Sequence, residues 1–205
     1  MRVHIAALMT VALAAGQGLA QPAPANLPTL KTEAAASVES RAKLAQVMTD
    51  EIFSYGELGY QEVETSKFIT DILEKNGFTV VRGVAGLPTG WTAVWKNGSG
   101  GPVIALGSDL DCLPKANQKP GVAAHEPLVP GAPGHGEGHN SGQAVNVVAA
   151  LAVKELMTRN HISGTLMLWP GEQRRAGEPN IHFRQHLHED ADRHIPDGRC
   201  HGSDR

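Results

Sequence analysis

The feature that most constrains this fold is the change of hydrophobic period along the chain. Apolar residues recur at helical spacing in two early segments, and the pattern then becomes strand-like before one more helical run. The expected helices cover residues 32–53, 62–75 and 142–157, and the expected strands cover residues 78–81, 91–95, 102–106 and 165–169. This alternation predicts an α/β fold, with helices packed on a mixed sheet. Asn140 or Ser141 is the expected N-cap of the last helix.

The composition limits the classes of function. The chain has 205 residues, a formal net charge of -3 and 41% hydrophobic residues, which is typical of a globular protein of one or two domains. A charge this small gives no reason to expect a nucleic acid or an acidic membrane surface as partner. Cys112 and Cys200 are too few for a disulfide scaffold, and whether they pair stays open.

The two ends of the chain differ from its middle. Residues 1–20 are predicted to be a signal peptide, with Arg2, an apolar run over residues 5–15 and small residues up to Ala20, where cleavage is expected. The protein is therefore expected to be periplasmic or secreted, without a membrane anchor. Residues 21–31 are expected to form a linker, and residues 32–170 the folded body. Residues 171–205 hold five of the ten histidines and little apolar periodicity. A frameshift, a truncated gene and a genuine tail all remain open for this segment.

Two acidic clusters are candidates for a metal site. Asp109 and Asp111 follow an apolar strand, and alternate residues of an extended segment point the same way. Glu137 and His139 stand among glycines at the end of a Pro/Gly-rich loop over residues 115–138 that is long for a simple connection. Carboxylates and an imidazole together suit zinc, manganese or cobalt. Each cluster alone also fits a polar turn.

A third carboxylate follows the last predicted strand. Glu172 comes soon after Trp169 and Pro170, beyond the carboxyl end of that strand, where α/β sheets place their ligand sites. Metal-assisted hydrolysis of an amide needs a base that takes a proton from water and returns it to the leaving amine. Glu172 is the candidate for that base, and a surface glutamate in a turn is the alternative.

Several short motifs in a fixed order make the chain resemble a known family. They are GYQE at 59–62, ETS at 64–66, GVAGLPT at 83–89, DCLP at 111–114 and GHGEGHN at 134–140. With this succession, residues 53–170 resemble the co-catalytic metal-dependent amidohydrolases and metallopeptidases of the aminoacylase and carboxypeptidase G type. The most similar branch is the aminobenzoyl-glutamate utilisation, or hippurate hydrolase-like, branch.

The resemblance implies a hydrolase with two divalent ions, zinc or manganese with cobalt as a further choice, that cleaves an N-acyl amino acid or peptide-like amide beside a free carboxylate. Glu137 stands where this branch has a metal-binding cysteine, and His139 matches the metal-binding histidine after it. Asp111 matches the aspartate of a D-A-L-P-like motif, a catalytic and metal-site position. Glu172 matches the catalytic base and Gln173 a ligand, while His201 echoes a later metal-binding histidine.

The chain also departs from the family pattern. Gln173 is a neutral amide where an anionic ligand is expected, and family members are much longer and can form homodimers. We therefore expect the N-terminal part of a two-metal hydrolase catalytic domain, with weak metal binding through Glu137 and His139 and little or no turnover. Two alternatives stay open. One is a non-catalytic exported metal-binding protein that uses the histidine-rich loop and tail, and the other is an unfolded, inactive remnant.

Overall fold

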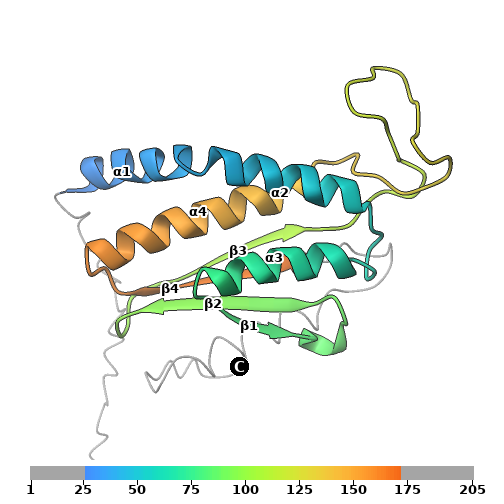
Figure 1. The fold of residues 1–205 in the computed structure, drawn as a ribbon. Coiled ribbons are helices and arrows are strands. Elements are labelled where there is room, and N and C mark those ends of the chain that lie inside the picture. Colours follow the sequence, from blue (N-terminus) through green and yellow to red (C-terminus); the bar gives the residue numbers. More distant parts are fainter. Residues whose placement is uncertain (1–25, 172–205) are drawn as a thin grey trace, which may run out of the picture.

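The computed structural model describes residues 26–171, in which helices pack on a four-stranded sheet (Figure 1). The elements are α1 (Leu27–Glu39), α2 (Ala42–Tyr55), α3 (Val63–Lys75), β1 (Thr79–Arg82), the 3-10 helix η1 (Val84–Gly86), β2 (Trp91–Asn97), β3 (Val103–Asp109), α4 (His139–Arg159) and β4 (Gly164–Gly171). The strand order is β1-β2-β4-β3, with β3 parallel to β4 and the other pairs antiparallel. The predicted α/β fold with a mixed sheet is therefore confirmed.

The parallel pair of strands decides where the ends of the elements meet. Helix α4 connects β3 to β4, so both strands run in the same direction, and their register places Asp109 opposite Gly171. The long segment between β3 and α4 runs out beyond this end of the sheet (Figure 1). The carboxyl ends of β3 and β4 and the N-terminus of α4 consequently lie together, the usual place for a ligand site in such a sheet.

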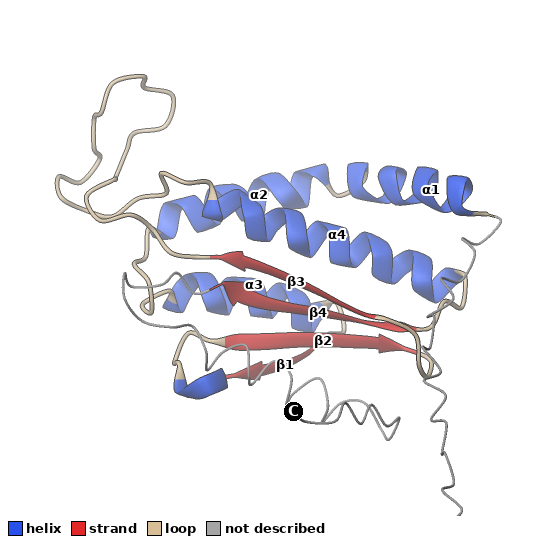
Figure 2. Ribbon diagram, turned by 180° about the vertical axis from the view of Figure 1, so that it is seen from behind, coloured by secondary structure: helices blue, strands red, loops and turns tan. Residues whose placement is uncertain are grey.

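One hydrophobic core lies between the helices and the sheet. Buried residues of α2, α3 and α4 pack against Ala93 of β2 and Leu166 and Leu168 of β4, all three at most 1% exposed. The two β4 residues are two positions apart, so their side chains point to the same face of the sheet. Helix α1 packs on α4 and lies farther from the sheet (Figure 2). None of the helices within residues 26–171 combines the length and apolar character that a membrane span needs.

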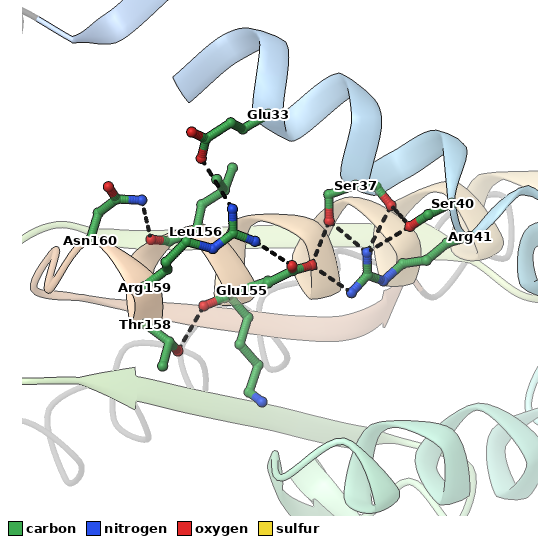
Figure 3. A network of polar contacts seen from close by, with 10 residues as sticks. Glu33, Ser37, Ser40, Arg41, Glu155, Leu156, Thr158, Arg159 and Asn160 are labelled. Atoms are coloured by element: carbon green, nitrogen blue, oxygen red, sulfur yellow. Dashed lines mark hydrogen bonds and ion pairs between the residues drawn. The ribbon is translucent and has the colours of Figure 1, made fainter. Parts of the chain in front are cut away.

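A polar network joins the first two helices to α4 (Figure 3). The Glu155 carboxylate accepts hydrogen bonds from Ser37 Oγ at 2.7 Å and from Arg41 Nη2 at 2.9 Å. Arg159 links the same carboxylate to Glu33 on α1. The hydrogen bond from Ser37, together with Arg41, lowers the pKa of Glu155 below its ordinary value. This network fixes the junction of α1 and α2 on the C-terminal half of α4.

The single helix predicted over residues 32–53 is wrong, because the chain breaks between α1 and α2. The carbonyl of Ser37, which a continuous helix would bond to the Arg41 N–H, instead accepts from Ser40 Oγ at 2.8 Å and from the Arg41 guanidinium at 2.7 Å. The Arg41 N–H bonds to Val38 instead. The linker expected over residues 21–31 is also corrected, since α1 begins at Leu27.

The predicted cap of the last helix is wrong as well. Helix α4 begins at His139, and Gly138 is its N-cap with a φ of 92°, a conformation that favours glycine. The amide of Asn140 donates to the Thr49 carbonyl at 3.2 Å, and Ser141 Oγ donates to the Gly138 carbonyl at 2.8 Å. Both candidate side chains are therefore bonded to carbonyls and not to the first N–H groups of the helix.

Candidate metal site

Three segments bring four candidate side chains together at the carboxyl end of β3. Asp109 is the last residue of β3 and Asp111 follows it, while Glu137 and His139 come from the glycine-rich stretch and the first turn of α4. Their side chains are 33%, 14%, 37% and 18% exposed, in the same order. The cluster is thus more open to solvent at Asp109 and Glu137 and least exposed at Asp111.

The imidazole of His139 lies at the centre of this cluster. Its Nδ1 is 3.0 Å from the backbone carbonyl oxygen of Asp111, and its Nε2 is 3.0 Å from Glu137 Oε2 and 3.8 Å from Asp109 Oδ2. When Nδ1 carries the proton and donates it to the carbonyl, Nε2 presents a lone pair towards two carboxylates. A lone pair facing anionic oxygens requires a proton or a cation between them.

Asp111 has a carboxylate oxygen that suits a cation. Its Oδ1 is buried and makes no hydrogen bond. This oxygen lies 3.0 Å from His139 Nδ1, but the proton on Nδ1 is donated to the backbone carbonyl of Asp111. Burial raises the pKa of the Asp111 carboxyl, with Asp109 adding to the effect and His139 opposing it. An unbonded buried carboxylate oxygen is costly, and a bound cation would compensate it.

The nitrogen and oxygen donors of the cluster fit a divalent cation, but the described part of the chain supplies only some of the ligands that such an ion needs. Within residues 26–171, no group of three or more His, Cys, Asp or Glu side chains is arranged to hold a metal ion. Carboxylates here surround the ring of His139, which agrees with a ligand set made of one imidazole and carboxylate oxygens. Further ligands must come from outside these residues or from a rearranged cluster.

Backbone contacts hold the segments of the cluster in register. Leu113 and Gly134 exchange two hydrogen bonds, of 3.0 and 3.1 Å, which join the segment after β3 to the glycine-rich stretch. A Cβ on Gly134 would lie 2.3 Å from the carbonyl oxygen of Ala116, so only glycine allows this close approach. The long loop therefore returns to the segment after β3 just before it supplies Glu137 and His139.

Comparison with known proteins identifies the relatives of this fold. No family model matches the chain. The chain is 33% identical over 147 residues to a subunit of the p-aminobenzoyl-glutamate hydrolase of Escherichia coli, covering 71% of this chain and 30% of that protein. It is 31% identical over 134 residues to N-acetyl-L-cysteine deacetylase of Bacillus subtilis, covering 63% of this chain and 30% of the relative.

A solved structure agrees with these sequences. It is a Bacillus subtilis protein described as a dinuclear metal-binding peptidase of the M20 family, with 26% identity and a TM-score of 0.53 over 65% of this chain and 36% of that one. The chain is therefore related to peptidases and amidohydrolases of the M20 family over the part that it shares with them. It spans about a third of the length of these relatives.

The family resemblance drawn from the motifs is thereby confirmed, and three of its predicted site residues, Asp111, Glu137 and His139, lie together. Asp109 joins them at the edge of the cluster. The remaining predicted residues, Glu172, Gln173 and His201, lie outside the described residues, as does Cys200. The chain reaches Glu172 directly after Gly171, which pairs with Asp109 in the sheet.

Two residues near the cluster have structural roles. His135 Nε2 lies 3.0 Å from the carbonyl oxygen of Ile52 near the end of α2, and its ring lies beside Phe53; burial lowers the pKa of His135. Cys112 is 4% exposed and forms no disulfide among the described residues. Burial, followed by the nearby charges of Asp111 and two glutamates, raises the pKa of the Cys112 thiol to about 12.

Motif reasoning gave no site role to Glu57 or Gly59, although Gly59 begins the GYQE motif. Glu57 accepts hydrogen bonds from two N–H groups of the first turn of α3, and Gly59 lies against the Asp111 carboxylate. A signal for Glu57 was present, since a carboxylate just before a predicted helix is favoured near the N-terminal end of its dipole. The contact of Gly59 has no local signal, because it joins segments about fifty residues apart.

Proposed function

We propose that this chain forms part of a metal-dependent amidohydrolase that cleaves an N-acyl amino acid or a similar peptide-like amide. The observation that carries the proposal is the cluster around His139, in which Nδ1 is bonded to a backbone carbonyl and Nε2 faces the carboxylates of Glu137 and Asp109. A histidine that ligates a metal through one nitrogen usually donates the other N–H in this way. The names of the Escherichia coli and Bacillus subtilis relatives support an amide or peptide substrate.

Each residue of the cluster has a separate task in this proposal. Glu137, His139 and Asp111 are the candidate ligands, and Asp109 adds negative charge beside them. The backbone carbonyl of Asp111 orients the imidazole and selects its tautomer. A bound divalent ion, zinc or manganese with cobalt as a further choice, supplies Lewis-acid polarisation of an amide carbonyl.

Glu172 has the proton-transfer task. A carboxylate that takes a proton from water and returns it to the leaving amine is needed for amide hydrolysis. Glu172 follows Gly171 in the sequence, and Gly171 is the last residue of β4, the strand that pairs with β3, which supports this role. Gln173 and His201 complete the proposed ligand set, with Gln173 a weak member because an amide carries no negative charge.

Metal binding is the first test. We expect the full 205-residue chain, freed of metal by a chelator, to bind manganese or zinc in calorimetry, and His139→Asn to lose at least about ten-fold in affinity. His125→Gln is the matched control, because His125 is an exposed histidine of the long loop and is not among the residues that face His139 in the cluster. Equal affinities for the wild type and His139→Asn would refute the site.

Hydrolysis is the second test. We expect the substrate to be a small amide with a free carboxylate, and release of an amino acid from N-acetyl or N-benzoyl amino acids measures it. Glu172→Ala is expected to abolish any turnover while leaving the bound metal in place, since it removes the proposed base. Metal binding without hydrolysis in the wild type would instead support the non-catalytic metal-binding protein.

Export and assembly are further parts of the proposal. Arg2, the apolar run over residues 5–15 and the small residues before Gln21 support cleavage near Ala20 and a periplasmic or secreted location. N-terminal sequencing of the native protein tests this, and an intact Met1 would contradict it. Homodimer formation is proposed only for the full-length family form, and light scattering of such a protein measures it.

A further inference from the structure

We propose that Glu57 is a positioning residue, which holds Asp111 in place against His139. This inference rests on the proposed metal site and assigns a role to a residue outside the cluster. Glu57 lies between α2 and α3, and its side chain is hydrogen-bonded to the first turn of α3. Its backbone carbonyl links it to the segment that carries Asp111.

The Glu57 carboxylate is anchored on α3 by both of its oxygens. Oε1 accepts from the N–H of Glu64 and Oε2 accepts from the N–H of Thr65, each at 2.9 Å. These N–H groups belong to the first turn of α3, where no intrahelical acceptor exists, and a negative charge is favoured at that end of the helix. The side chain of the N-cap residue Glu62 does not take this task. Glu57 is therefore fixed to a rigid element.

The backbone of the same residue holds the segment that carries Asp111. The carbonyl oxygen of Glu57 accepts a hydrogen bond from the N–H of Cys112 at 2.7 Å, and Leu58 forms a parallel bridge with Cys112. Cys112 is buried, so this hydrogen bond is shielded from competing water. Fixing Glu57 consequently fixes the peptide group between Asp111 and Cys112, whose carbonyl belongs to Asp111.

That carbonyl is the group that orients the imidazole. Asp111 O lies 3.0 Å from His139 Nδ1, and a Cβ on Gly59 would lie 3.6 Å from Asp111 Oδ2, so the segment after Glu57 also runs alongside the carboxylate. The contacts thus form one chain from α3 through Glu57 and the backbone of Asp111 to His139. Loosening its first member should shift the carbonyl that selects the tautomer of His139.

The test compares Glu57→Gln with Glu155→Gln. Glutamine keeps one acceptor oxygen but loses the second bond to α3. Glu155 is the matched control, because it also accepts several hydrogen bonds (Figure 3) and stands sixteen residues along α4 from His139, ~24 Å away at the usual helical rise. We expect Glu57→Gln to lower manganese or zinc affinity about ten-fold, and Glu155→Gln to leave it unchanged at comparable unfolding midpoints in urea.

A second readout separates this inference from the metal proposal. The hydrogen bond from His139 Nδ1–H to the carbonyl of Asp111, observed by NMR in the metal-free protein, is expected to be present in the wild type and weakened in Glu57→Gln. If the wild type binds no metal, the proposed function fails, and this spectrum still decides the role of Glu57. Unchanged His139 signals in a folded Glu57→Gln protein would overturn the inference.

Glu57→Asp guards against a variant that fails to fold. It keeps the negative charge at the N-terminus of α3, but its side chain is one methylene shorter and cannot hold both N–H groups in the same way. We expect it to fold and to show the same weakened hydrogen bond from His139 Nδ1–H. A hydrogen bond of wild-type strength in Glu57→Asp, with a stability change alone, would show that Glu57 only caps α3.

Discussion

Replacing Gly142 by alanine measures how closely the N-terminal part of α4 is seated on β3. A Cβ at this position would lie 2.4 Å from Ser108 Oγ and 3.5 Å from Ser108 Cβ. The hydroxyl of Ser108 is weakly held, with only a 3.5 Å hydrogen bond to the Asp109 carbonyl. The conflict is therefore with one atom of a side chain that can turn away.

Two opposing terms set the size of the effect. Alanine in a helix is more stable than glycine by roughly 0.5–1 kcal/mol. Forcing Ser108 from its preferred rotamer costs roughly 0.5–1.5 kcal/mol. We therefore expect Gly142→Ala alone to change the free energy of unfolding by about zero. With Ser108→Ala the conflicting oxygen is gone, the remaining 3.5 Å contact is ordinary, and the gain of roughly 0.5–1 kcal/mol should appear.

A double-mutant cycle checks this reasoning. Urea unfolding of the wild type, the two single variants and the double variant gives the coupling energy between positions 108 and 142, expected to be about 1 kcal/mol. Ser108 and Gly142 lie next to the ends of β3 and α4 that carry Asp109 and His139, so their contact bears on the spacing of those two residues. If Gly142→Ala changes the free energy of unfolding equally, within ~0.3 kcal/mol, in the wild type and in Ser108→Ala, the close packing of α4 on β3 is refuted.

Three further predictions concern the buried interior. Burial raises the pKa of Glu62, which accepts a hydrogen bond from Thr89. The protonated form of Glu62 therefore contributes stability below about pH 4.5, and this contribution is lost as the pH rises through the pKa of the folded state. In Glu62→Gln, the midpoint of urea unfolding should fall less between about pH 4 and about pH 7 than in the wild type. The same dependence of the midpoint on pH in both proteins would contradict this. Leu168→Ala, at a fully buried position, should cost roughly 2–5 kcal/mol in urea unfolding, and Val103→Ala, at a position 42% exposed, far less; equal costs would contradict the core assignment. Cys112 should react slowly with iodoacetamide in the native protein and rapidly in urea, and equal rates would show that it is accessible.

Several elements could be predicted because their cause is local. The helical period of residues 62–75, closed by Asn76 and Gly77, predicted α3 within one residue of its bounds, and the short apolar runs predicted the four strands. Local patterns also located Asp111, which follows an apolar strand, and Glu137 and His139, which stand among glycines. In each of these cases neighbouring residues carry the information.

Three features had causes of a different kind: the break between α1 and α2, the start of α4 at His139, and the role of Glu57. Arg41 leaves the helical pattern because its guanidinium serves Ser37 and Glu155, and Glu155 lies more than a hundred residues away. The tautomer of His139 is set by the carbonyl of Asp111, whose peptide group Glu57 holds from the segment between α2 and α3. The sequence by itself determined which segments form helices and strands and which side chains could bind a metal. Only the tertiary structure decided how these side chains face one another, because hydrogen bonds between distant segments select one backbone position among many that the local pattern allows.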